Sequence, residues 1–155
     1  MRRTISILAG LIALTASASA QDEQTVEFAD TRFSITETDD YQKVLTADGA
    51  EIARDYVIFH DRNVTLDDTE VAIFETGPGG NMCGTVSLLI WRDGDELKTA
   101  APPDDCGAPP AAVTQDAIFF VPYLMPGGDG VVRRWSPAEG LQVHGTIAYA
   151  PEPDT

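Results

Sequence analysis

Basic residues and cysteines are scarce in this chain of 155 residues. Ten Lys and Arg stand against 25 Asp and Glu, which gives a formal net charge of −15. So few cations could not neutralise a run of phosphates, and this argues against nucleic acid as a partner. Two cysteines are also too few for a Cys-rich zinc module, which needs three or four ligands at fixed spacings.

Histidine and serine are scarce as well. His60 and His144 are the only histidines, and they lie too far apart in the sequence for a local zinc-binding spacing. After residue 20 the serines are Ser34, Ser87 and Ser136, and none stands in the G-x-S-x-G motif of serine hydrolases. The sequence therefore predicts no catalytic residue, no metal ligand and no cofactor, and it favours a protein that is not an enzyme.

No apolar run approaches the length of about 20 residues that crossing a bilayer requires. The uncharged segment 4–14 follows Arg2 and Arg3, and the small residues Ala18-Ser19-Ala20 come soon after it. This order is typical of a secretory signal peptide, here residues 1–20, with cleavage after Ala20. A retained N-terminal anchor helix is the alternative. We expect an exported protein, periplasmic or secreted, that has no membrane span after cleavage.

Short runs in which apolar residues alternate with polar ones recur through the mature chain, and turn residues separate them. Such runs, rich in Val, Ile and aromatic residues, are typical of β-strands. They lie at 26–28, 33–35, 56–59, 71–74, 86–91, 117–121, 131–135 and 141–147. Outside the signal peptide no window has the apolar spacing of a helix. The predicted fold is an all-β sandwich or barrel of about eight to ten short antiparallel strands. It forms one acidic domain over 21–155, with a frayed tail at 151–155.

A weak internal repeat accompanies this pattern. Trp91 and Leu97 flank one turn with a W-x5-L spacing, and Trp135 and Leu141 repeat that spacing 44 residues later. A looser third hairpin spans residues 45–52. A period of 40–50 residues is typical of propeller blades, but three hairpins are too few to close a propeller, and two matches can arise by chance.

Cys83 and Cys106 are the two cysteines, and an even number in an exported chain predicts a disulfide. Closing a loop of this length contributes about 3 kcal/mol, mainly by restricting the unfolded chain. A nucleophilic thiol is the alternative, but it needs a positive neighbourhood. Asp104 and Asp105 beside Cys106 would instead disfavour the thiolate.

One tripeptide is basic although the chain as a whole is acidic. Arg133-Arg134-Trp135 combines two scarce cations with one of two tryptophans, and Arg and Trp often anchor interfaces. It is therefore a candidate interaction patch. The alternative is that the arginines alternate across a strand and pair with nearby carboxylates.

The turn Gly79-Gly80-Asn81-x-Cys83, followed by a strand and then Cys106, resembles a known pattern. It is similar to uncharacterised small exported proteins of Gram-negative bacteria that carry a G-G-N-x-C turn and a second cysteine about twenty residues later. The resemblance covers roughly residues 72–147. It implies a periplasmic β domain with a disulfide, and it brings no activity or catalytic residue.

These observations favour a binding or accessory role in the periplasm, with a cationic protein or an envelope component as the partner. A purely structural domain that docks through Arg133, Arg134 and Trp135 is a second hypothesis. An envelope hydrolase or metal-assisted enzyme that uses His60 and His144 is the alternative from another class. It requires both histidines and nearby carboxylates to meet in one cleft.

Overall fold

A computed structural model describes residues 23–80, 83–103, 108–124 and 126–149. Within these residues the chain forms twelve strands and no helix. The predicted all-β class is confirmed. The number of strands exceeds the expected eight to ten because short edge strands such as Glu96–Ala100 and Pro110–Val113 contain too few large apolar residues to be noticed.

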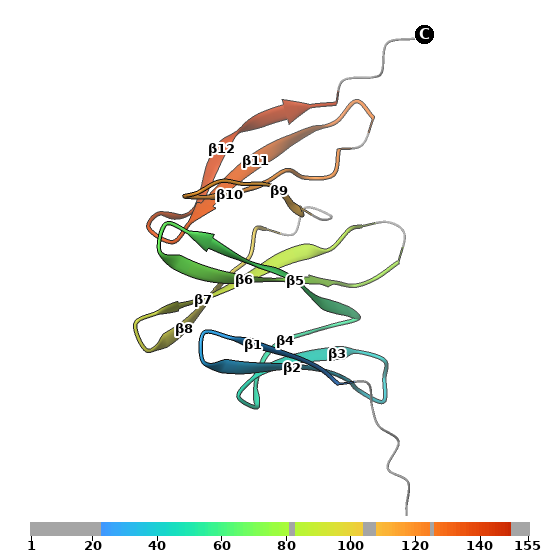
Figure 1. The fold of residues 1–155 in the computed structure, drawn as a ribbon. Coiled ribbons are helices and arrows are strands. Elements are labelled where there is room, and N and C mark those ends of the chain that lie inside the picture. The colour runs from blue at the N-terminus through green and yellow to red at the C-terminus, as the bar shows by residue number, and fades with distance from the viewer. Residues whose placement is uncertain (1–22, 81–82, 104–107, 125, 150–155) are drawn as a thin grey trace, which may run out of the picture.

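The strands form three four-stranded antiparallel sheets, and each sheet uses four strands in chain order (Figure 1). Sheet A contains β1 (Gln24–Phe28), β2 (Thr31–Glu37), β3 (Lys43–Ala47) and β4 (Ala50–Asp55). Sheet B contains β5 (Val57–Leu66), β6 (Thr69–Gly77), β7 (Val86–Asp93) and β8 (Glu96–Ala100). Sheet C contains β9 (Pro110–Val113), β10 (Ile118–Phe120), β11 (Asp129–Ser136) and β12 (Gly140–Ala148).

The three sheets stack as layers, with sheet B in the middle (Figure 1). In the described residues all three sheets are open. Of the two predicted architectures, the structure is therefore a layered sandwich and not a barrel. One buried cluster joins sheets A and B, and it includes Phe33, Leu45 and Phe74. A second buried cluster joins sheets B and C around Ile73, Leu89 and other residues described below.

Strand β6 shows why sheet B is the middle layer. Its residues Val71, Ala72, Ile73 and Phe74 are all fully buried. Successive side chains of a strand point to opposite faces, and here they alternate between the two clusters. A strand that is covered on both faces reads as a continuous apolar run rather than an alternating one.

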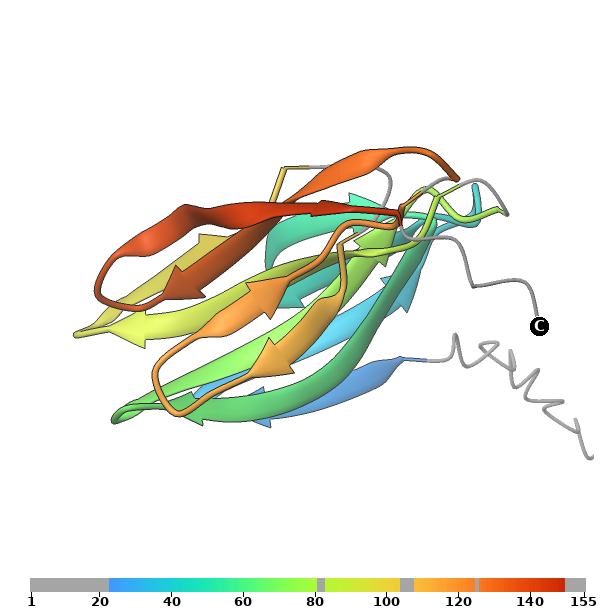
Figure 2. The ribbon, with the colours of Figure 1, turned by 90° about the horizontal axis from the view of Figure 1, so that it is seen from above.

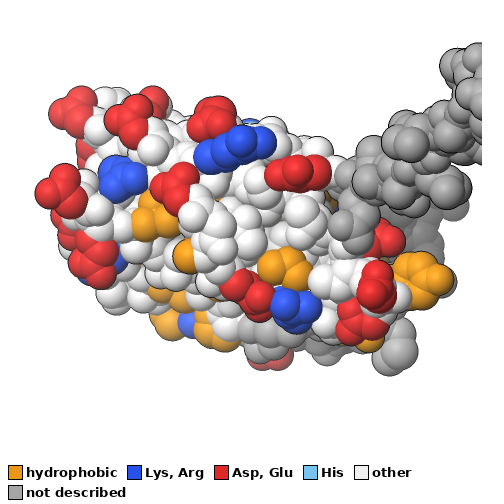
Figure 3. Space-filling model, turned by 90° about the horizontal axis from the view of Figure 1, so that it is seen from below, with side chains coloured by type: hydrophobic (Ala, Val, Ile, Leu, Met, Phe, Trp, Pro, Cys, Tyr) orange, Lys and Arg blue, Asp and Glu red, His pale blue; other side chains and the backbone are white. Residues whose placement is uncertain are grey.

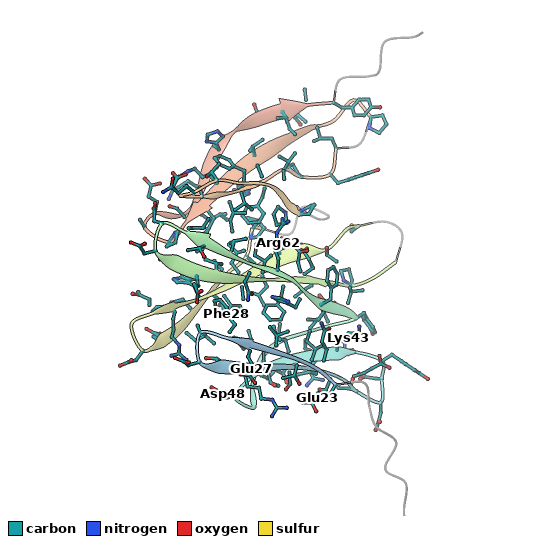
Figure 4. All side chains as sticks on the ribbon, viewed as in Figure 1. Glu23, Glu27, Phe28, Lys43, Asp48 and Arg62 are labelled. Carbon is teal, nitrogen blue, oxygen red and sulfur yellow. The ribbon has the colours of Figure 1, made fainter. Side chains whose placement is uncertain are left out.

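Aromatic rings fill both layers. Between sheets A and B the rings of Phe33 and Phe74 lie 5.5 Å apart, centroid to centroid, and Phe28 lies beside them (Figure 4). Between sheets B and C the rings of Trp91 and Trp135 meet edge to face at 4.9 Å. This geometry is favourable because a ring edge is positive and a ring face negative.

The three hairpins of this weak internal repeat occupy corresponding positions in the three sheets. The Trp91 hairpin is formed by β7 and β8, the Trp135 hairpin by β11 and β12, and the looser hairpin by β3 and β4. Each pair is the third and fourth strand of its sheet. The repeated spacing in the sequence thus coincides with a repeated four-stranded unit.

The strands of all three sheets begin and end at the same two ends of the molecule, and these two ends differ (Figures 1 and 2). At one end, which we call the turn end, two to four residues join each pair of strands, namely 29–30, 48–49, 67–68, 94–95, 114–117 and 137–139. The opposite end, which we call the loop end, holds the longer connections that follow β2, β6, β8 and β10, together with Tyr56 between β4 and β5.

Candidate functional site

The structure does not bring the two histidines together. His60 lies on β5, where its ring contacts Phe74 at 5.2 Å and its Nε2 is 2.9 Å from Asn63 Oδ1, on the side of sheet B that faces sheet A. His144 lies on β12 of sheet C against Phe119. Sheet B separates them. The described residues contain no group of three or more His, Cys, Asp or Glu arranged to hold a metal ion.

The triplet on β11 does not form an exposed patch. Trp135 is buried in the core between sheets B and C. The Arg134 guanidinium donates to Asp116 Oδ2 at 2.9 Å and also to Glu139. Trp135 is therefore core, and Arg134 pairs with local carboxylates as in the alternative that the sequence left open, while a role of the triplet in an interaction stays a prediction. Arg133, which directly precedes Arg134 on β11, is half-buried.

The structure places one of the two cysteines. Cys83 lies in the connection before β7, at the loop end, and Cys106 lies outside the described residues. A parallel bridge joins Val86 to Ala108, so the chain segments that follow the two cysteines run side by side. The pairing of Cys83 with Cys106 stays a prediction.

Tyrosine is distributed differently from the other aromatic residues. All six Phe and both Trp lie within strands, whereas the four Tyr lie outside them. Each tyrosine is exposed: Tyr41 by 76%, Tyr56 by 53%, Tyr123 by 72% and Tyr149 by 40%. All four belong to connections or strand ends at the loop end, so the exposed rings gather at one end of the molecule.

Local hydrogen bonds fix the backbone at Tyr41. The Tyr41 amide donates to the Thr38 carbonyl at 3.0 Å, and the Thr38 amide donates to the Gln42 carbonyl at 2.8 Å. This tight loop gives Tyr41 a φ of 63°, an uncommon conformation for a residue with a side chain. The Thr38 hydroxyl donates to Asp40, and this bond lowers the pKa of the Asp40 carboxyl. The loop thus presents a ring beside an ionised carboxylate.

Hydrogen bonds also hold the backbone at Tyr56 and Tyr149. The Tyr56 amide donates to Asp55 Oδ1 at 2.8 Å. The Tyr149 amide donates to the Gly128 carbonyl at 2.9 Å, which ties the end of β12 to the loop that contains Tyr123. These bonds orient the chain while the rings stay in solvent.

The loop end of sheet A also carries an open groove of about 790 Å³. Its charged and aromatic lining consists of Glu23, Glu37, Asp39, Tyr41 and Lys43. Three carboxylates and one ammonium group line the groove together with the exposed Tyr41, so the groove is acidic. Glu37 and Lys43 face each other across β2 and β3. Figure 4 labels Glu23, directly before β1, and Lys43 on β3.

Carboxylates are not confined to the loop end. Seen from below, sheet A carries acidic side chains near both ends and few basic ones (Figure 3). At the turn end a cleft of about 650 Å³ lies over Arg134 and is bordered by Asp67, Asp68, Asp116 and Glu139. What distinguishes the loop end from the turn end is therefore the tyrosines and not the charge.

The sequence patterns did not single out the tyrosines. The available signal was their context. Tyr41 follows two aspartates, Tyr56 follows another, and Tyr123 stands between a proline and a Leu-Met-Pro-Gly-Gly segment. Residues of those types are typical of turns, so the neighbouring rings were candidates for exposure.

The fold and site define an all-β domain of three stacked four-stranded sheets with an exposed aromatic end. The chain belongs to the Y4bG N-terminal domain family, whose model matches residues 29–148. The match begins in the first turn of sheet A, directly after β1, and ends with β12, so it covers all the described strands except β1.

A curated relative supports the same assignment. The chain is 25% identical over 112 residues to the uncharacterized protein y4bG of Sinorhizobium fredii (strain NBRC 101917 / NGR234). The aligned part is 72% of this chain and 41% of the relative, so the chain spans less than half the length of that protein. No solved structure matches the chain. Within the described residues there is no helix with the length and hydropathy that a membrane crossing requires.

Proposed function

We propose that this protein is an exported, non-enzymatic domain that binds a basic protein of the cell envelope through its loop end. The observation that carries the proposal is the gathering of all four tyrosines, exposed, at that end. Tyrosine supplies a large contact area with few rotatable bonds and tolerates solvent, which explains its enrichment at binding surfaces.

The chemistry of the loop end favours a cationic partner. An Arg or Lys side chain can stack on a tyrosine ring and donate to a carboxylate beside it. Tyr41 stands next to Asp39 and Asp40, and Tyr56 follows Asp55. The net charge of −15 would also accelerate encounters with a basic protein.

Export and the disulfide belong to the same proposal. The charged start, the uncharged segment 4–14 and the small residues before Gln21 support export. The Val86–Ala108 bridge and the absence of a free cysteine among the described residues support a Cys83–Cys106 bond. The resemblance to small exported proteins with a G-G-N-x-C turn agrees with both.

An intact mass measurement tests export and the disulfide together. The protein isolated from its own compartment should have the mass of residues 21–155, less about 2 Da for two thiol hydrogens. A full-length mass would contradict cleavage, and a mass that reduction leaves unchanged would contradict the disulfide.

We do not retain the hydrolase alternative. That hypothesis needs His60 and His144 in one cleft, and sheet B lies between them.

Site-specific cross-linking in the producing cell tests the binding function. A photoreactive phenylalanine analogue would replace Tyr41 or Tyr123 at the loop end, with Ala138 at the turn end as the matched exposed control. The loop-end positions should cross-link to a protein of high isoelectric point, and a tenfold increase in salt before illumination should remove the product. Equal products from Ala138, or products that salt does not affect, would refute the proposal.

A further inference from the structure

A charged side chain lies inside the core of the molecule. Glu75 on β6 is 4% exposed, and it is the only charged side chain that is buried in the part of the chain that the structure describes. It follows Ile73 by two residues, so it lies on the face of sheet B that is turned toward sheet C. Burying a carboxylate is costly unless hydrogen bonds or an opposite charge compensate it. Such a costly position points to a role beyond packing.

Two hydroxyl groups compensate the Glu75 carboxylate. The Thr85 hydroxyl donates to Glu75 Oε2 at 2.7 Å, and the Ser87 hydroxyl donates to Glu75 Oε1 at 2.6 Å. Glu75 and Ser87 also face each other in the pairing of β6 with β7. Each carboxylate oxygen thus holds one hydroxyl. Both hydroxyls belong to the segment 85–87, which begins two residues after Cys83.

The backbone of the same segment is also held in place. A Cβ atom at Gly77, the last residue of β6, would lie 3.4 Å from Thr85 Cα, so the two backbones are in close contact there. On the other side, Val86 forms the parallel bridge to Ala108, which follows Cys106 by two residues. The segment after Cys83 is therefore fastened to β6 through Glu75 and to the chain after Cys106 through the backbone.

We propose that Glu75 is a positioning residue for the Cys83–Cys106 disulfide, because its carboxylate holds the segment after Cys83 in place while the thiols are still reduced. The proposal rests on the disulfide of the proposed function. When the bond forms, the two thiols lose two protons and two electrons to a disulfide oxidant, which leaves as two thiols. A fixed segment raises the effective concentration of one thiol at the other and so favours the bond.

Equilibration of the mature protein with a glutathione redox buffer, followed by mass measurement of the oxidised fraction, tests the proposal. Glu75→Gln should lower the equilibrium constant for disulfide formation at least about fivefold, because an amide offers one acceptor oxygen in place of two and the segment loosens. Glu70→Gln, at an exposed position on the same strand, is the matched control and should leave the constant unchanged.

Leu89→Ala separates positioning from general stability. Leu89 is fully buried on β7 between sheets B and C, so its truncation destabilises the fold. The Glu75 carboxylate and its two hydroxyls stay in place, and this variant should therefore keep the wild-type constant. Circular dichroism would verify that each reduced variant folds. Thr85→Val, which removes one of the two donors, replaces Glu75→Gln if that variant does not fold.

Three outcomes would overturn the proposal. Equal constants in the wild type and in the Glu75 and Thr85 variants would show that the carboxylate does not position the cysteine. An equal loss in Leu89→Ala would show that the effect is one of general stability. A wild type that forms no disulfide would overturn this proposal and the disulfide of the proposed function together, and the binding of a basic partner at the loop end would still stand.

Discussion

At the scale of single residues, Arg92 fastens sheet A to sheet B. Its guanidinium donates to the Ala29 carbonyl at 2.9 Å, to the Thr31 hydroxyl at 2.6 Å and to the Asp95 carbonyl at 3.0 Å. Thr31 is buried, and Ala29 adopts a φ of 47° in the turn before it. One side chain therefore supports a strained turn and joins two layers.

Arg92→Met should destabilise the fold by about 1–3 kcal/mol, because partly buried acceptors lose their donors while the apolar stem is kept. Arg32→Met, at an exposed position on β2, should change stability by less than about 0.5 kcal/mol. Urea unfolding of both variants measures the difference. Equal stabilities would show that the hydrogen bonds to Ala29 and Thr31 do not hold the layers together.

Asp116 provides a test in acid. The Thr114 hydroxyl and then the Arg134 guanidinium stabilise its carboxylate and lower its pKa. A folded-state pKa below the unfolded one stabilises the protein above the unfolded value, and this contribution disappears as pH falls through the folded value. The effect therefore lies below about pH 4.

Carboxyl NMR titration should find the Asp116 pKa below its usual value, and Thr114→Ala should raise it toward that value. Thr146→Ala, on β12, should leave it unchanged. A normal Asp116 pKa in the wild type would contradict the geometry at the turn end.

At the scale of elements, the sequence predicted the strands better than it predicted the layers. Runs such as 71–74 and 131–135 became β6 and β11 because β-branched and aromatic residues mark buried strands. Which sheet each strand joins depends on contacts between distant segments, and the alternating pattern does not encode these. The unbroken apolar run in β6 was the one local sign of a middle layer.

The candidate site was less predictable from the sequence. Trp135 and the tyrosines are all aromatic, and the sequence alone does not say which rings face solvent. Burial separates them, since Trp135 is enclosed between sheets while Tyr123 lies in a connection. The scarcity of basic residues made the β11 triplet conspicuous, yet Asp116 and Glu139 come close to Arg134 only in the folded chain.

Two adjacent substitutions on β6 test the layered arrangement. Ile73→Ala faces sheet C and should cost about 2–5 kcal/mol, and Phe74→Ala faces sheet A and should cost about 3–5 kcal/mol. In a two-layered sandwich one of these positions would face solvent. Thermal unfolding of both variants, with exposed Val143→Ala as a control, distinguishes the arrangements, and a neutral effect at either β6 position would contradict three layers.

The loop that carries Tyr123 depends on Gly130. A Cβ atom at Gly130 would lie 2.4 Å from Pro122 Cγ and 2.7 Å from Leu124 Cδ2, so an alanine there must displace the residues on both sides of Tyr123. At Gly145, on β12, a Cβ would meet nothing within 4 Å.

Gly130→Ala should therefore destabilise the protein by about 1–3 kcal/mol and accelerate amide hydrogen exchange in the loop after β10. Gly145→Ala should do neither. Similar exchange rates in the two variants would show that the loop does not rest on Gly130.

At the scale of the whole molecule, the turn end and the loop end have different chemistry. Both ends are acidic, but the four exposed tyrosines lie at the loop end. If charge alone governed binding, a basic partner would contact the turn end as readily. If aromatic contacts beside carboxylates are needed, the partner should select the loop end.

Amide chemical-shift mapping with lysozyme as a basic probe tests this central claim most directly. The account predicts shifts concentrated in residues 38–42, 55–57 and 121–128, with few changes at 94–95 and 137–139, and weaker shifts in a Tyr41→Ser/Tyr123→Ser variant of unchanged charge. Shifts spread evenly over both acidic ends, or an unaltered response in the variant, would contradict it.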